Sequence, residues 1–137
     1  MKIQLTSVEV FGDTAWRGKC PTETAEQVTF FGRLRRKYPD TWGRLAIHPR
    51  NEGKRTAQQT MRAKAEGMTA GTSDIVIPGR PSFVCELKRR DHTQSKWEPG
   101  QVDYLETAKR AGCFACVALG ADAATEAFEL WAKSQTL

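Results

Sequence analysis

The chain has 137 residues, of which 39% are hydrophobic and 27% are charged, a composition typical of an ordinary soluble globular protein. This length is sufficient for one hydrophobic core, so we expect a single domain over residues 1–137. No apolar run approaches the roughly 20 residues that a membrane-spanning helix needs, and Met1–Leu5 lacks the basic-then-apolar pattern of a signal peptide. These features argue against a membrane protein and lead us to expect an intracellular location.

The net charge of +5 is unevenly distributed along the chain. Residues 33–64 contain ten Lys or Arg and two acidic residues, whereas residues 97–137 contain three basic and six acidic residues. A protein polarised in this way favours a polyanionic partner, and nucleic acid is the commonest one. Charge runs also occur on faces that are merely solvated, so this pattern alone leaves both interpretations open.

The first half of the chain predicts two short strands and a helix. We expect a strand around Val8–Val10, and then a helix that Thr22 caps and that runs to about Lys37. Arg44–His48 is expected to form a further short strand, followed by a polar loop over residues 48–55.

The second half alternates helices and strands. Thr56–Gln59 matches a capping box and opens a helix that Gly67 ends. After a hairpin, we expect a helix over residues 101–111, a buried strand over residues 113–119, and a last helix capped by Asp122.

The hairpin is predicted from two apolar runs, Ser73–Pro78 and Phe83–Lys88, which a Pro- and Gly-containing turn separates. If Ile77 lies opposite the first residue of the second strand, Asp74 falls opposite Glu86, with Cβ atoms about 5 Å apart. Two carboxylates at that distance repel each other unless a cation lies between them. The hairpin therefore predicts a cation site.

The order of strand, helix and strand between residues 83 and 119 predicts a β-α-β crossover with parallel strands. Together with the antiparallel hairpin, this crossover predicts a mixed sheet with helices on both faces. The fold class expected from the sequence is therefore α/β.

The hairpin residues suit hydrolysis of a phosphodiester. Oxygen atoms of Asp74, Glu86 and the Leu87 carbonyl would suit Mg²⁺ or Mn²⁺, and such an ion activates water and neutralises phosphate charge. Lys88 would lie beside that water. Gln101, at the start of the next helix, could hold a water or a phosphate oxygen. Asp followed by Glu-x-Lys is nevertheless a loose pattern that many exposed strands carry.

More specific motifs surround this pattern and occur in a characteristic order. They are Glu26-Gln27, His48-Pro49-Arg50-Asn51-Glu52-Gly53-Lys54-Arg55, the stretch from Lys64 to Asp74, Glu86-Leu87-Lys88, and Pro99-Gly100-Gln101. In this order they resemble the VRR-NUC family, a branch of the PD-(D/E)xK nuclease superfamily, over residues 23–119. Two departures are Ser73, where the family has Pro, and Glu52, inserted before Gly53.

The resemblance implies a restriction-endonuclease-like mixed β-sheet flanked by helices and a nuclease that depends on Mg²⁺ or Mn²⁺. The implied metal ligands are Asp74, Glu86 and the carbonyl of Leu87, and the implied catalytic residue is Lys88. The resemblance also implies an acidic residue from the first helix. Glu26 matches this position best, and Glu23, one turn earlier, remains an alternative.

Stand-alone members of the family of this size are phage-type enzymes, so the resemblance also implies a homodimer that acts on branched DNA such as Holliday junctions. The implied location is the cytoplasm of a bacterial or phage-infected cell, with no organic cofactor and no membrane partner. Two other functions stay open, namely a non-catalytic nucleic-acid-binding module with the same fold and a sequence-specific restriction-type nuclease.

Basic residues near the hairpin and in the polar loop are expected to contact the phosphate backbone rather than read bases. Those in the loop are accompanied by one amide, and two more follow Lys88 directly. The candidate nucleic-acid-binding residues are Arg50, Asn51, Lys54, Arg55, Arg89 and Arg90. His48 is expected to be a packed loop residue or a phosphate contact.

Overall fold

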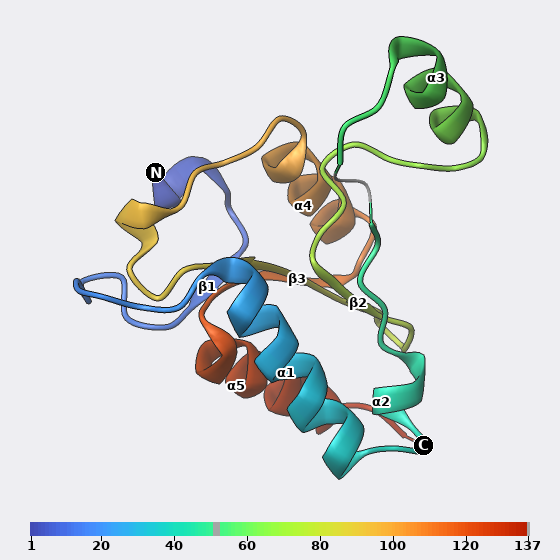
Figure 1. Cartoon of the computed structure of the whole chain (residues 1–137). Helices are drawn as coiled ribbons and strands as arrows, with labels where there is room; N and C mark the ends of the chain where they lie inside the picture. Colours follow the sequence, from blue (N-terminus) through green and yellow to red (C-terminus); the bar gives the residue numbers. More distant parts are fainter. Residues whose placement is uncertain (51–52, 137) are drawn as a thin grey trace.

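A four-stranded mixed sheet with the strand order β1-β4-β3-β2 lies at the centre of the computed structural model, which describes residues 1–50 and 53–136 (Figure 1). The strands are β1 (Glu9–Phe11), β2 (Ile75–Ile77), β3 (Phe83–Lys88) and β4 (Phe114–Leu119). The helices are α1 (Glu23–Lys37), α2 (Trp42–Leu45), α3 (Ala57–Ala65), α4 (Gln101–Arg110) and α5 (Ala121–Ala132), with short 3-10 turns at Ile3–Leu5 and His92–Gln94.

The predicted pairing of the hairpin is confirmed. β2 runs antiparallel to β3 with Ile77 opposite Phe83 and Ile75 opposite Cys85, so the next position places Asp74 beside Glu86. The predicted parallel pairing of β3 with β4 is also confirmed, and β1 adds a third parallel strand along β4. The fold is therefore α/β with a mixed sheet, as expected.

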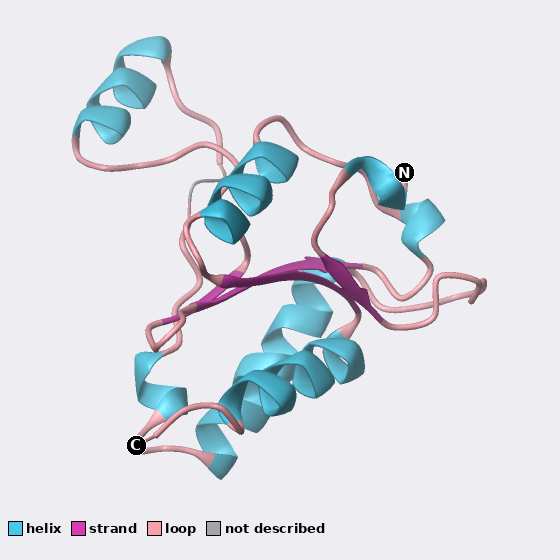
Figure 2. Cartoon of the chain, turned by 180° about the vertical axis from the view of Figure 1, so that it is seen from behind, coloured by secondary structure: helices cyan, strands magenta, loops and turns pink. Residues whose placement is uncertain are grey.

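Helices cover both faces of the sheet (Figure 2). On one face, α1 and α5 bury a large aromatic core in which Phe83 packs against Phe128 and Trp131. On the other face, α4 covers Val84 and Val117 with Leu105. Because side chains alternate along a strand, every second residue of β3 points toward the α4 face.

That alternation places charged side chains inside the protein. Glu86 and Lys88 share the α4 face with Val84, and both are only 1% exposed. A charged group in the interior is tolerated only where other groups neutralise it or donate hydrogen bonds to it. The α4 face of β3 must therefore supply such partners.

The predicted strand over Arg44–His48 is wrong. Trp42–Leu45 forms the helical turn α2, and only Ile47 makes an isolated bridge, with Val76. Packing explains the difference, because the Trp42 ring lies 4.9 Å from that of Trp131 and thereby holds the segment against α5. Gly43 allows this close turn, since a Cβ there would lie 2.6 Å from the Tyr38 carbonyl oxygen.

The predicted capping residues are confirmed at two helices and wrong at a third. Thr22 caps α1 and Thr56 caps α3, in the second case with the full capping box. Asp122 does not cap α5, because the cap position is Gly120 and the helix begins at Ala121. A carboxylate from α1 takes the place of a local cap, as described below.

Helix α3 stands away from the rest of the protein in both views (Figures 1 and 2). It has no buried residue, and Met61 is 70% exposed. Its capping box and the Arg62–Glu66 ion pair are interactions within the segment itself. No helix in the described residues has both the length and the hydropathy needed to cross a bilayer.

The N-terminal segment is held to α4 by the Glu106 carboxylate, which accepts hydrogen bonds from the Ser7 hydroxyl, the Ser7 main chain and the Thr6 hydroxyl. These bonds favour the ionised carboxylate and lower the pKa of Glu106 to about 2. A depressed carboxyl pKa stabilises the folded state above the unfolded pKa of about 4.3, and this contribution is lost as the pH falls toward 2.

We therefore expect Glu106→Gln to unfold at a lower urea concentration than the unsubstituted chain at pH 7, and the difference to shrink as the pH falls from about 4 to 2. Urea titrations at pH 7, 4 and 2.5, followed by circular dichroism, measure the difference. Glu126→Gln, at an exposed position of α5, is the matched control. A difference of equal size at all three pH values would contradict the assignment.

Candidate active site

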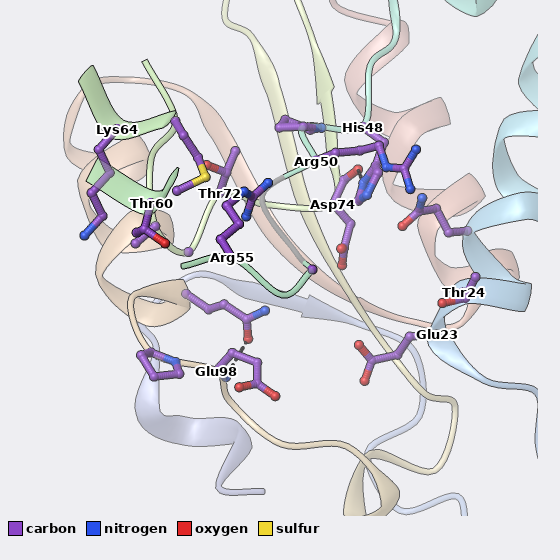
Figure 3. Close-up of a pocket in the computed structure, with 18 residues that line it drawn as sticks. Glu23, Thr24, His48, Arg50, Arg55, Thr60, Lys64, Thr72, Asp74 and Glu98 are labelled. Carbon is purple, nitrogen blue, oxygen red and sulfur yellow. Dashed lines mark hydrogen bonds between the residues drawn. The ribbon is translucent and has the colours of Figure 1, made fainter. Parts of the chain in front are cut away.

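Asp74 and Gln101, two of the residues expected at the site, line a cleft of about 880 Å³ (Figure 3). Asp74 precedes β2, and Gln101 begins α4. The N-terminus of α1, the loop after His48 and helix α3 form the other walls. Glu86 and Lys88 lie next to this cleft, on the α4 face of β3.

Lys88 is held in one position by its neighbours. Its Nζ donates to the main-chain oxygen of Lys96 at 2.7 Å and to Oε1 of Gln101 at 2.8 Å. The same nitrogen lies 3.9 Å from Glu86 Oε1 and 4.8 Å from the centre of the Trp97 ring. Two acceptors, a carboxylate and an aromatic face thus surround the buried ammonium group.

Gln101 connects Lys88 to Glu86. Its Oε1 accepts from Lys88 Nζ and from the main-chain nitrogen of Glu98, so this atom must be the oxygen of the amide. The amide nitrogen then donates to Glu86 Oε1 at 3.1 Å. The structure therefore places Gln101 between the two charged residues.

Asp74 lies against the main chain of β3. Its Oδ2 accepts from the Leu87 nitrogen at 2.8 Å, and its own main-chain oxygen lies 2.8 Å from Nδ1 of His48. Asp74 is half-buried and lines the cleft, whereas Glu86 behind it is buried. The two carboxylates predicted to lie side by side are thus on the same face of the sheet.

Glu86 has an unsatisfied oxygen. Gln101 donates to Oε1, but the buried Oε2 has no hydrogen-bond partner in the described residues. Burial raises the pKa of Glu86 well above its ordinary value, and the adjacent Asp74 carboxyl raises it further, whereas Lys88 lowers it. A buried carboxylate oxygen without a hydrogen bond destabilises the folded state unless a proton or a cation lies beside it.

The available oxygen atoms fit a hard divalent cation. Asp74 Oδ2 already accepts from Leu87, which leaves Oδ1 together with Glu86 Oε2 and the Leu87 carbonyl as oxygen donors of the type that Mg²⁺ and Mn²⁺ prefer. The described part of the chain contains no group of three or more His, Cys, Asp or Glu side chains that could hold a metal. A site here would therefore need the main-chain oxygen as well as the two carboxylates.

The structure separates the two candidate acids of α1. Glu26 Oε2 accepts from the Ala121 nitrogen at 2.9 Å and so caps α5, next to Gly120, where a Cβ would collide with this carboxylate. Glu23 lines the cleft, accepts from the Ser95 hydroxyl at 2.7 Å, and contributes to the raised pKa of Glu86. The first helix thus brings Glu23, and not Glu26, to the other site residues.

The basic residues fall into two groups. Arg50 and Arg55 line the cleft, and Figure 3 shows both there. Arg89 instead donates to the carbonyl oxygens of Cys20 and Pro21, and Arg90 stacks 4.1 Å from the Trp16 ring. These two side chains hold the segment before α1, which accounts for their positions without a nucleic acid.

Two further candidates of the loop have different outcomes. Lys54 is exposed but does not line the cleft, and Asn51 lies outside the described residues. Sequence reasoning also missed several contributors, because they belong to no recognised motif. They are Thr60 of α3, which lines the cleft, and Ser95, Lys96, Trp97 and Glu98, which contact site residues. Lys64, the first residue of the motif that ends at Asp74, lines the cleft as well.

Comparison with known proteins gives one informative result. No family model matches the chain, and no curated protein matches it. A solved structure described as a "VRR_NUC domain protein" superposes with a TM-score of 0.68 and 21% sequence identity, and the match covers 85% of this chain and 92% of that one. The chain has the VRR_NUC fold. The fold expected from the ordered motifs is thereby confirmed, including its restriction-endonuclease-like mixed sheet.

The repulsion at Glu86 predicts a stabilising substitution. Glu86→Gln removes the carboxyl group whose ionisation is opposed by burial and by Asp74, and it supplies an N–H that can donate to Asp74, so we expect the free energy of unfolding in metal-free buffer at pH 7 to rise. Because the raised pKa belongs to the folded state, unfolding lets Glu86 ionise, and the gain should grow as the pH rises from 4 toward 7.

Urea titrations at pH 4 and pH 7 in the presence of a chelator test this expectation. Glu129→Gln, an exposed carboxylate of α5, is the matched control and should leave stability unchanged at both pH values. A Glu86→Gln chain that is less stable than the unsubstituted one at pH 7 would contradict the raised pKa.

Proposed function

We propose that the chain is a divalent-metal-dependent nuclease that hydrolyses phosphodiester bonds in DNA. The observation that carries this proposal is Oε2 of Glu86, which has no hydrogen-bond partner among the described residues and is buried next to Asp74, on the same strand as a fixed Lys88. The likeness to a VRR_NUC domain protein supports the same conclusion.

The residues that would hold the metal are Asp74, Glu86 and the main chain of Leu87. When bound there, Mg²⁺ or Mn²⁺ would supply an activated water and neutralise charge on the phosphate. Asp74 lines the cleft, and Glu86 is buried behind Asp74, so a metal ion held by both would lie at the wall of the cleft. Gln101 keeps one oxygen of Glu86 occupied and thereby leaves the other for the cation.

Lys88 is the candidate catalytic cation. Its ammonium group is fixed by acceptors before any substrate arrives, so no reorganisation is needed when negative charge develops on the phosphate. We assign the acidic residue of the first helix to Glu23, because Glu26 is used as the cap of α5.

The walls of the cleft support a nucleic-acid substrate. Arg50, Arg55 and Lys64 line it, and Figure 3 shows Arg55 and Lys64 on the side away from Glu23. Such positive charges suit the phosphate backbone, whereas the acidic residues suit a metal ion. The exposed helix α3 lengthens the basic wall beyond the body of the protein.

Branched DNA such as a Holliday junction is the substrate that we propose, with a homodimer as the active form. Both proposals rest on the resemblance to the VRR-NUC family. A two-fold dimer presents two equivalent sites to two strands, which suits paired cuts at a junction. Duplex DNA cut to discrete bands would instead favour a restriction-type nuclease.

The first test is cleavage of a synthetic four-way junction in Mg²⁺ or Mn²⁺. We expect Asp74→Ala and Lys88→Ala each to lower the cleavage rate by at least about 10²-fold, because each removes a group that acts on the developing charge. The same strands assembled as single strand, duplex, flap and junction compare the substrates. Cleavage that survives both Lys88→Ala and a chelator would reject the mechanism.

Calorimetric titration with Mn²⁺ separates a nuclease from a non-catalytic binding module. The nuclease requires Mn²⁺ binding that Glu86→Gln abolishes, whereas DNA binding without any Mn²⁺ binding would favour the module.

The second test compares the two acids of α1. We expect Glu23→Ala to lower kcat by about 10-fold or more and to change stability little, because its carboxylate faces the cleft. Glu26→Ala should leave kcat intact and lower the free energy of unfolding by about 1 kcal/mol, the usual cost of losing a helix cap. Junction cleavage and urea unfolding of both variants give the answer. The reverse pattern would restore Glu26 to the site.

A further inference from the structure

A four-residue connection, Ser95–Glu98, contacts three of the side chains that make up the candidate site. It lies between the 3-10 turn His92–Gln94 and helix α4, outside every strand of the sheet. We call it the 95–98 segment. None of its residues belongs to a motif that the sequence singled out.

Ser95 connects Glu23 to the end of β3. Its hydroxyl donates to Glu23 Oε2 at 2.7 Å and accepts from the main-chain nitrogen of Arg89 at 2.9 Å. Because a hydroxyl has one proton, donation to Glu23 fixes its orientation, and the Arg89 nitrogen fixes the oxygen. Ser95 is buried, so water does not compete for these bonds.

The next three residues act on Lys88 and Gln101. The Lys96 carbonyl accepts from Lys88, and the Trp97 ring lies over the same ammonium group. The main-chain nitrogen of Glu98 donates to Gln101 Oε1. Each site side chain that the segment touches is thus restrained by a main-chain group, an aromatic ring or a buried hydroxyl.

The segment is itself anchored through Trp97, and the 3-10 turn that precedes it is held as well. Trp97 Nε1 donates to the main-chain oxygen of Lys2 at 2.9 Å. On the other side, the buried Asp91 accepts from the main-chain nitrogens of Gly18 and Thr93 and from the Gln94 side chain. These bonds and the Thr93 hydroxyl lower the pKa of Asp91 and keep it ionised. A rigid support of this kind is what precise placement of a site requires.

We propose that the 95–98 segment positions the site, with Ser95 as the positioning residue for Glu23 and Trp97 as the positioning residue for Lys88. The inference rests on the proposed nuclease function. Ser95 determines where the Glu23 carboxylate lies relative to Asp74 and Glu86, and its effect on the reaction is exerted through Glu23.

A double-mutant cycle between Ser95 and Glu23 tests this dependence. We expect Ser95→Ala to lower kcat for junction cleavage by about 10- to 100-fold with little change in KM, as loss of an orienting hydrogen bond does at metal sites. Ser95→Thr keeps the hydroxyl and should restore most of kcat. In the Glu23→Ala chain, adding Ser95→Ala should cause no further loss.

Trp97 has a matched pair of variants. Trp97→Phe and Trp97→Leu both lose the bond to Lys2, but only Trp97→Phe keeps an aromatic face over Lys88. We expect kcat to be largely retained in the Phe variant and to fall several-fold in the Leu variant. Equal kcat in both variants would remove Trp97 from the proposal.

Mn²⁺ titration gives a readout that does not depend on cleavage. Displacing the Glu23 carboxylate should weaken Mn²⁺ binding several-fold in Ser95→Ala, and this effect should vanish in the Glu23→Ala background. An unsubstituted chain that cleaves no DNA rejects the proposed function, and the titration then decides the coupling alone. The inference is overturned if Ser95→Ala lowers kcat by the same factor in both backgrounds, or if it leaves both kcat and Mn²⁺ affinity unchanged.

Discussion

Burial of two opposite charges on one strand is the constraint on which the rest of the structure depends. Glu86 and Lys88 point from the central strand β3 into the protein, where neither can be solvated. Their nitrogen and oxygen atoms are 3.9 Å apart, too far for the pair to satisfy itself by a direct hydrogen bond. The surrounding chain must therefore provide donors and acceptors, and within residues 1–50 and 53–136 it does so for every polar side-chain atom of the pair except Glu86 Oε2.

This requirement explains why α4 begins where it does. Gln101 is the first residue of α4, and from this position its amide contacts Lys88 and Glu86 at the same time. The 95–98 segment completes the arrangement with the Lys96 carbonyl and the Ser95 hydroxyl. Burial of the charged pair lowers the stability of the fold, but it also leaves the groups of the site oriented before a substrate binds.

Helix α1 shows how one element serves both the fold and the site. Glu23 and Glu26 are three residues apart, so they lie on neighbouring faces of the helix. Glu26 reaches the start of α5 because Gly120 leaves room for its carboxylate, whereas Glu23 faces the cleft. One acid therefore joins the two helices that cover the aromatic core, and the other joins α1 to the segment beneath Lys88.

The sequence by itself determined the local and repetitive features. The hairpin register followed from alternation, the starts of α1 and α3 from their capping threonines, and the α/β order from the strand and helix periodicities. It also brought Asp74, Glu86, Lys88 and Gln101 together, because neighbouring strands and the following helix share one edge of the sheet.

Only the tertiary structure decided the features that depend on contacts between distant residues. The Trp42–Trp131 contact turned an expected strand into α2, and the space above Gly120 gave the cap of α5 to Glu26 rather than to Asp122. The proposed roles of Ser95 and Trp97 also depend on tertiary contacts. Neither residue belongs to a motif, and only the folded chain places the hydroxyl beside Glu23 and the indole beside Lys88. Local propensity carries no information on long-range packing, and for that physical reason the choice between Glu23 and Glu26 could not be made from the sequence.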